Sequence, residues 1–293
     1  MPPRVNPSER QRRLGAELRR LRTRARMSGD DVGALLDADR TRVSHIEAGR
    51  VDVPRNGLYK LLRAFGCDDG PLFDALMDMA HDRGKGWWDE FRDVVAPVGC
   101  DLAELEFRST DIRMHEPLFV PGLLQTADYA RAVIAESEGD ARRVDRFVAF
   151  RLARQRVLTA ELPVTFRVIV HEAALHAQIG GPRTMRRQLL RLIEAARLPN
   201  VTVQVFPFEA GAYSSYSSSF GIFAGAVPEL ATVILEQPLD SVFLRDGGHI
   251  DEYARMFERL SELALAPVDP EAPPESHDSR DSLSLIQHVM YKL

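Results

Sequence analysis

The sequence lacks any long apolar run, and cysteine and tryptophan are scarce in it. It has 2 Cys and 2 Trp among 293 residues, and no run approaches the roughly 18 apolar residues that a membrane-spanning helix needs. We therefore expect no contact with a membrane. Cys67 and Cys100 lie far apart and without metal-ligand spacing. This favours thiols in a reducing compartment over a disulfide framework or a zinc site.

The N-terminal stretch MPPRVNPSERQRR also lacks the apolar core of a secretory signal. We therefore expect a cytoplasmic protein. The composition, with 45% hydrophobic and 28% charged residues, is ordinary for a globular chain. The length allows two domains, each with a core of its own.

The net charge of −5 combines two segments of opposite sign. Residues 1–65 contain 15 Lys and Arg against 8 Asp and Glu, a balance of +7, whereas the remaining residues contain 23 against 35, a balance of −12. A basic segment attached to an acidic remainder suggests that the first part binds a polyanion. Because the acidic part repels a polyanion, we expect the contact to be confined to the first part.

Residues 8–79 have the apolar spacing of short helices. Capping and turn residues follow one another at short intervals between the apolar stretches: Ser8, Ser28, Asp39, Gly49, Pro54 and Pro71. This pattern predicts a compact five-helix domain over residues 1–80.

The stretch RTRVSHIEA (40–48) has two different sides when it is placed on a helix. Val43 and Ile46 lie on the side that packs inward. The other side carries four polar residues: Arg40, Thr41, Ser44 and His45. All four can hydrogen-bond to base edges, and helix-turn-helix proteins place such a helix in the major groove. The small residues Gly33 and Ala38 before it suit the close helix crossing of that motif. A structural bundle with a solvated arginine face is the alternative.

Residues 17–50, ELRRLRTRARMSGDDVGALLDADRTRVSHIEAGR, resemble the helix-turn-helix domains of the phage-repressor, Cro-like (XRE) class. The resemblance is carried by the LRxLR pattern of the first helix and the VSxIExGR pattern of the third. It implies that Arg40, Thr41 and His45 occupy base-reading positions. It implies phosphate or flanking-base contacts for Arg42, Ser44 and Arg50. It also implies a buried ion pair between Arg22 and Glu47, which would tie the first helix to the third.

Two positions depart from the pattern of that class. The class usually has Gln where this chain has Gly29, which puts one phosphate or base contact in doubt. Asp37 stands where the turn usually has glycine. Aspartate tolerates a left-handed backbone at modest cost, so we expect the fold to be kept.

Residues 81–100 form a predicted connecting segment, because glycine and proline interrupt any periodicity there. Residues 101–293 then mix two patterns. Strand-like runs lie at 164–170, 201–208, 219–225, 231–237 and 241–246. Helical stretches are predicted near 101–116, 123–137, 140–160, 183–197 and 247–265, and the C-terminal SLSLIQHVMYKL has an apolar helical stripe. The predicted fold class is α + α/β, in which the N-terminal five-helix domain is joined to a C-terminal α/β regulatory or dimerisation domain with a small mixed sheet.

Several blocks of this larger part resemble the C-terminal domain of actinomycete regulators of the WhiJ-like type. They are EPLFVPGLLQTADYARAVI (116–134), RLARQRVL (151–158), VIVHEAALHAQIGGPRTMRRQLLRLIE (168–194) and NVTVQVFPFEAGAYSSYSSSFGIF (200–223). The resemblance implies a transcription regulator that is often encoded beside a small partner protein. Some relatives are described as antitoxin-like.

The motif HEAALH (171–176) brings two histidines together at a spacing of five residues. The zinc-binding pattern of metalloproteases needs a spacing of four, which puts both on one helical face. We therefore expect no metal site here, and instead a helix that begins near Glu172.

The stretch FEAGAYSSYSSSF (208–220) combines aromatic and hydroxyl side chains, which are typical of small-ligand pockets. Candidate pocket residues are Tyr213, Tyr216 and Phe220, with Glu236 and Arg245 as weaker candidates at strand ends. A flexible surface loop, with surface ion pairs for the two charged residues, is the alternative. No nucleophile elbow occurs, so we expect no catalytic residues and no cofactor.

These features favour a sequence-specific transcription regulator that binds double-stranded DNA as a homodimer on an inverted repeat. Its large domain would dimerise, sense a small-molecule effector or bind a small partner protein. An antitoxin-like protein that holds a small partner and regulates its own gene is the alternative. A third hypothesis, an enzyme with a DNA-binding appendix, lacks a nucleophile–base pair or a metal set in the sequence.

Overall fold

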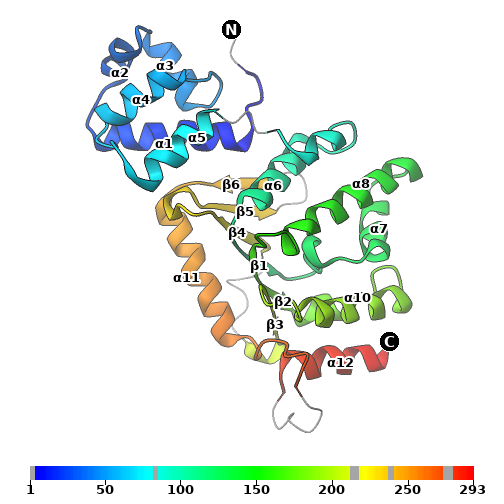
Figure 1. Ribbon diagram of the computed structural model, residues 1–293. Helices are drawn as coiled ribbons and strands as arrows, with labels where there is room; N and C mark the ends of the chain where they lie inside the picture. Colours follow the sequence, from blue (N-terminus) through cyan, green and yellow to red (C-terminus); the bar gives the residue numbers. More distant parts are fainter. Residues whose placement is uncertain (1–3, 82–84, 212–217, 237–240, 273–279) are drawn as a thin grey trace. The chain divides into compact units, whose positions relative to one another are not determined.

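The structure, a computed structural model, describes residues 4–81, 85–211, 218–236, 241–272 and 280–293 (Figure 1). The chain divides into two compact units. The first contains residues 1–92, 96–105 and 225–231, and the second contains residues 93–95, 106–224 and 232–293.

The first unit contains the five short helices that the sequence predicts. They are α1 (Glu9–Arg24), α2 (Gly29–Leu36), α3 (Arg40–Glu47), α4 (Arg55–Ala64) and α5 (Gly70–His81). The predicted caps are confirmed, since Ser8, Ser28 and Asp39 each accept a backbone N–H of the helix that follows. Leucines and valines from all five helices form one core, in which Leu58 and Leu62 are fully buried.

The first unit also includes stretches from later in the sequence. A short 3₁₀ helix, η1 (Trp87–Phe91), buries Trp88, and α6 (Pro97–Arg108) begins inside the predicted connecting segment 81–100. The turn at residues 225–231 belongs to this unit as well. In that turn Leu230 packs against the five-helix core, and the backbone carbonyl of Glu229 accepts a hydrogen bond from the buried Arg13 guanidinium.

The second unit is built on a mixed six-stranded sheet with the order β3-β2-β1-β4-β5-β6. Its strands are β1 (Asp111–Glu116), β2 (Thr165–His171), β3 (Val201–Phe206), β4 (Phe220–Ala224), β5 (Thr232–Glu236) and β6 (Ser241–Leu244). β1, β2 and β3 are parallel, whereas β4, β5 and β6 are antiparallel to their neighbours. The predicted small mixed sheet is thus confirmed.

One predicted helix was wrong over half its length. The sequence pattern predicted a single helix over 101–116, but α6 ends at Arg108 and residues 111–116 form β1. β1 pairs with β2 on one side and with β4 on the other. The pattern was misleading because this central strand buries His115 and Glu116, polar residues that interrupt the apolar alternation of a strand.

Helices lie on both faces of this sheet (Figure 1). α11 (Gly247–Leu263) lies on one side, where Phe257 and Leu260 pack on the sheet with Ile222 and Val233. The other side carries α7 (Ala127–Ala135), α8 (Ala141–Arg154), α10 (Pro182–Ala195) and α12 (Ser282–Lys292). The C-terminal stripe packs as predicted, since α12 contacts α10 and β3 and buries Ile286 and Val289.

The helix predicted to begin near Glu172 is α9 (Glu172–His176), and the Nδ1 atom of His171 accepts the N–H of Ala173 at 3.0 Å. Within the described ranges, no cluster of three or more His, Cys, Asp or Glu residues is arranged to hold a metal ion. Over the same ranges, no helix has the length and apolar character needed to cross a membrane.

Candidate nucleic-acid interface

The turn between α2 and α3 has the geometry of a helix-turn-helix motif. Asp37 adopts the left-handed conformation with φ 50° and ψ 50°, as expected from its place at the turn. The Ala38 N–H then donates to the Gly33 carbonyl at 2.9 Å. A Cβ atom on Gly33 would lie only 2.6 Å from the Ala38 carbonyl oxygen. The close crossing predicted from these two small residues is therefore confirmed.

An ion pair fixes α3 against α1. Arg22 donates to the Glu47 carboxylate through Nε at 2.6 Å and through Nη2 at 3.2 Å, and its Nη1 atom donates to the Met27 carbonyl at 2.8 Å. Both side chains are largely buried, at 18% and 13% exposure. The contact implied by the family resemblance is thus present. The bidentate geometry gives α3 a defined orientation, because a guanidinium fork matches a carboxylate in only a few arrangements.

α3 has one buried and one exposed side. Val43 and Ile46 are 3% and 4% exposed and lie in the core. The residues predicted to contact DNA lie outside the core: Arg40, Thr41, Arg42, Ser44 and Arg50 are exposed, and His45 is half-buried. Polar groups of the N-terminal half of the helix are therefore available to a ligand in the solvent.

Arg40 bridges the second and third helices at their N-terminal ends. Its guanidinium lies 4.0 Å from the Asp30 carboxylate, and the side chains are 77% and 72% exposed. The aliphatic part of Arg40 lies over Gly29, since a Cβ atom there would be 3.3 Å from Arg40 Cγ. The place at which related domains carry Gln is therefore covered by the stem of Arg40.

His45 is more buried than Arg40. The Nδ1 atom of its ring is buried and has no hydrogen-bond partner among the described residues. Its carbonyl accepts the N–H of Arg50 at 2.8 Å. His45 thus lies at the edge of the exposed side, next to the turn that carries Arg50.

The N-terminal arm lies along the same turn, a contact that the sequence patterns did not predict. The Arg4 N–H donates to the Arg50 carbonyl at 2.9 Å, and its guanidinium forms a bidentate ion pair with Asp52. This ion pair raises the pKa of Arg4. The signal was weak in the sequence because the partners lie 48 residues apart.

The arginines of α1 differ in how far they are exposed. Arg13 is 4% exposed, and Arg20 donates to the buried Glu17 at 2.7 Å. Arg20 is nevertheless exposed, as are Arg19 and Arg24. Part of the positive charge of α1 therefore holds the unit together, and only part is available to a polyanion.

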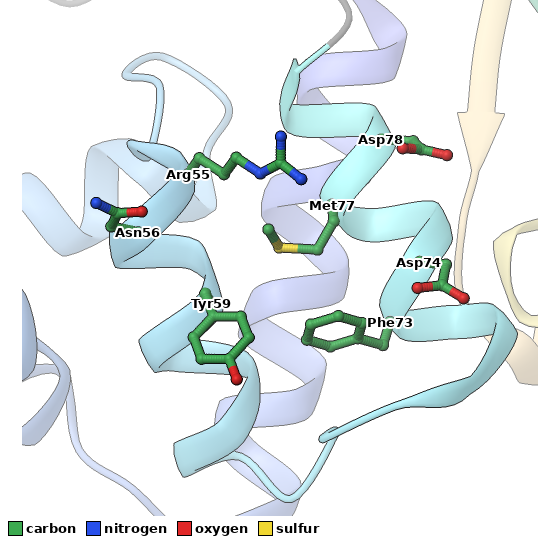
Figure 2. Close-up of a pocket in the computed structure, with 7 residues that line it drawn as sticks. All are labelled: Arg55, Asn56, Tyr59, Phe73, Asp74, Met77 and Asp78. Carbon is green, nitrogen blue, oxygen red and sulfur yellow. The ribbon is translucent and has the colours of Figure 1, made fainter.

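A cavity of about 440 Å³ lies between α4 and α5 (Figure 2). The aromatic rings of Tyr59 and Phe73 meet edge to face at 5.9 Å, and Met77 lies beside them. Arg55, Asn56, Asp74 and Asp78 line the rest. None of the six predicted DNA contacts lines this cavity, so it is separate from the exposed side of α3.

The second unit does not bring the predicted pocket residues together. Phe220 is 2% exposed and packs on Tyr253 of α11. It pairs with Leu235, so Glu236, one residue further along β5, points to the opposite face. Arg245 follows Leu244, which pairs with Val233, at the far end of β5 from Glu236. Tyr213 and Tyr216 lie outside the described residues.

The sequence patterns missed a group of buried charges in this unit. Arg154 is paired with Glu106 by hydrogen bonds of 2.6 and 2.8 Å. Glu116 is 6% exposed, and Arg151 donates to the Gln125 side chain at 2.7 Å. The only sequence signal was the presence of charged residues inside otherwise apolar segments, which is also typical of a solvated face.

Comparison with known families separates the same two parts of the chain. Residues 13–76 match a helix-turn-helix domain family. Residues 100–270, more than half of the chain, match the family described as domain of unknown function, DUF5753. The chain belongs to this family. No curated protein and no solved structure shows significant similarity to it. The chain thus combines a helix-turn-helix domain, which indicates a DNA-binding regulator, with a larger domain whose family name assigns it no role.

Proposed function

We propose that this protein is a sequence-specific, cytoplasmic transcription regulator that places α3 in the major groove of double-stranded DNA. Arg40, Thr41 and His45 contact base edges, and Arg42, Ser44 and Arg50 contact phosphates or flanking bases. The observation that carries the proposal is the exposed polar side of α3, held on a helix-turn-helix frame by the Arg22–Glu47 ion pair. The net charge of +7 on residues 1–65 supports it, because phosphate contacts supply much of the affinity for DNA.

The mode of binding that we propose is a homodimer on an inverted repeat. One small domain buries limited surface on DNA, and specific affinity generally needs two half-sites. The two half-site centres should lie about one helical turn, or a multiple of it, apart. Nuclease protection of a single half-site by a monomer would contradict this part of the proposal.

The second unit is proposed to adjust DNA binding in response to a small-molecule effector or a small partner protein. The turn at residues 225–231 supports this role, because it links β4 directly to β5 while packing in the core of the first unit. A structural change in β4 or β5 can therefore reach the helices of the first unit through the chain itself.

The test is binding of the purified protein to DNA upstream of its own gene, with excess nonspecific competitor. Arg40→Ala should cost on the order of 1–3 kcal/mol and relax base preference at one position. Arg63→Ala is the matched control, because Arg63 is an exposed arginine of α4 paired with Asp68. An unchanged base preference in Arg40→Ala would show that the docking is wrong. Absence of specific binding by the wild type would favour the antitoxin-like alternative, which predicts co-purification with a neighbouring gene product.

A further inference from the structure

One end of the sheet in the second unit carries a row of polar side chains. His115 pairs with Phe220, and Phe220 pairs with Leu235. One residue further along, the same register brings together a row of three residues: Glu116, Ser219 and Glu236. Glu236 in turn pairs with Ser241 of β6. Successive residues of a strand point to opposite faces. Because Phe220 packs towards α11, this row points to the other face.

Burial decreases along the row. Glu116 is 6% exposed, Ser219 is half-buried and Glu236 is exposed. The Ser219 hydroxyl oxygen is itself buried and lies beside the Glu116 carboxyl group, but it has no hydrogen-bond partner of normal geometry among the described residues. In the described part of the chain, neither Glu116 nor the nearby Arg151 forms an ion pair, whereas the adjacent Arg154 is fully paired with Glu106. Buried polar groups are normally satisfied, so unsatisfied ones call for a ligand or another explanation.

The charges around Glu116 do not balance. Glu236 of β5 is a second carboxylate and Arg151 of α8 is a single cation, and Tyr129 of α7 lies near enough to Glu116 to interact with its charge. Burial and the neighbouring Glu236 raise the pKa of Glu116 to about 8, against smaller opposing effects of Ser219 and Arg151. Burial and Arg154 lower the pKa of Arg151 to about 10. These surroundings therefore favour a protonated Glu116 at neutral pH, and a cation placed between the two carboxyl groups would favour its ionised form.

We propose that Glu116, Ser219 and Glu236 bind the primary ammonium group of a small molecule. An ammonium group has three N–H donors, which the two carboxyl groups and the hydroxyl oxygen can accept. A hard divalent cation fits less well, because it takes about six or more oxygen ligands. Arg151 lies close enough to receive a carboxylate of the same molecule, so an amino acid or a related zwitterion is favoured over a simple amine.

The row has a direct connection to the first unit. Ser219 directly precedes β4, and Glu236 is the last residue of β5. The residues that join these two strands, 225–231, belong to the first unit. An ammonium ligand at the row is therefore in a position to be the effector, a step that rests on the proposed regulatory function. Binding to the row itself does not depend on that function.

The test uses isothermal titration calorimetry of the full-length protein, without DNA, at pH 7. The probes are 1,4-diaminobutane, 4-aminobutanoate, butyrate and 1,4-butanediol. We expect the two amines to bind, with 4-aminobutanoate the tighter, and butyrate and butanediol not to bind. Repeating the titration in buffers of different ionisation enthalpy should show release of about one proton per amine bound, because Glu116 ionises. Binding of butyrate alone, or of neither amine at millimolar concentration, would overturn the proposal.

Variants of Glu116 test whether the calorimetric signal comes from binding at the row. Glu116→Gln should weaken amine binding roughly 10- to 100-fold, which is the usual effect of losing a charged hydrogen bond, and should abolish proton release. The variant is expected to fold, since glutamine resembles the protonated carboxyl group. Glu194→Gln, a change of the same kind on the exposed side of α10, should leave both values unchanged. Equal affinity in the wild type and in Glu116→Gln would contradict the site even if the amines bind.

DNA affinity, measured with and without 4-aminobutanoate, separates the two proposals. Amine binding that leaves DNA affinity unchanged would keep the site and reject its role as an effector site. Loss of specific DNA binding under all conditions would reject the proposed function and leave the calorimetric result as it stands.

Discussion

At the scale of single residues, Asp37 shows how one backbone conformation sets a motif. Its φ of 50° lies in the left-handed region, where an L side chain is strained and glycine is not. Asp37→Gly should therefore stabilise the first unit by about 0.5 kcal/mol, the relief of strain being partly offset by a more flexible unfolded chain. Ala34→Gly, inside the helix α2 that ends just before Asp37, should instead cost about 1 kcal/mol of stability. Urea unfolding followed by circular dichroism measures both, and the same sign for the two changes would refute the argument.

Glu116 makes a second prediction at this scale, on the pH dependence of stability. Its pKa in the folded protein is about 8, above the ordinary value of 4.5. The protonated group therefore favours folding, and this contribution is complete below about pH 4.5 and is lost as the pH rises through 8. The wild type should lose stability over this window by an amount on the order of a few kcal/mol.

Glu116→Gln removes the titrating group and so should flatten this pH dependence. Compared with the wild type, the variant should have a similar melting temperature at pH 5 and a higher one at pH 9. Glu194→Gln serves as the control, and it should follow the wild type at both pH values. A wild-type curve that Glu116→Gln leaves unaltered between pH 5 and pH 9 would show that Glu116 does not titrate there.

At the scale of elements, glycine decides how closely the helices of the first unit cross. A Cβ atom on Gly15 of α1 would collide with the Glu47 backbone carbonyl of α3, which is held by the helix and by the Arg22 ion pair. A Cβ atom on Gly57 of α4 would meet side chains alone, with the Leu36 Cδ2 atom at 3.0 Å as its one close contact and Val53 and Pro54 atoms at ordinary distances of 3.5 and 3.8 Å. Backbone cannot move aside as a leucine side chain can, so the two sites should respond differently to the same substitution.

Gly15→Ala should destabilise the first unit by about 1–3 kcal/mol through overpacking, in spite of the gain in helix propensity. Gly57→Ala should be neutral or stabilising by up to about 1 kcal/mol, because the same propensity gain meets a side chain that can adjust. Melting temperatures and hydrogen exchange of residues 9–24 and 40–47 report on both variants. Equal losses in the two would mean that the α1–α3 contact is no tighter than the one between α4 and Leu36.

At the scale of the whole molecule, the first unit is assembled from three separated stretches of chain, not from the N-terminal residues alone. Leu230 of the 225–231 turn packs against the five-helix core, and Arg13 is held by the Glu229 carbonyl. Removing these contacts should therefore weaken helices that lie more than 200 residues earlier in the sequence, since the Arg13–Glu229 separation alone is 216 residues.

Leu230→Ala should cost the first unit about 1–2 kcal/mol, less than a fully buried leucine, because Leu230 is only partly buried. Leu162→Ala is the matched control, since Leu162 is 91% exposed. Hydrogen exchange of the α1 and α5 peptides should rise in the first variant and stay unchanged in the second. Unchanged exchange in Leu230→Ala would show that the turn does not stabilise these helices.

The sequence by itself determined the features that depend on neighbouring residues. Ser8, Ser28 and Asp39 cap helices wherever they precede an apolar periodic stretch, and the five predicted strands form because alternation and β-branched residues act locally. The two sides of α3 follow from its period alone, and the Arg22–Glu47 pair was available from the family resemblance.

Only the tertiary structure decided which distant residues meet. β1 became a strand because β2 and β4 pair with both of its edges, a stabilisation that outweighs its mixed local pattern. The same register puts Glu116, Ser219 and Glu236 in one row and separates Glu236 from Phe220 and Arg245. A shift of one residue in pairing reverses the face of every side chain, so no sequence pattern could specify this row. The burial that raises the pKa of Glu116 is likewise a property of the packed sheet and not of the residue.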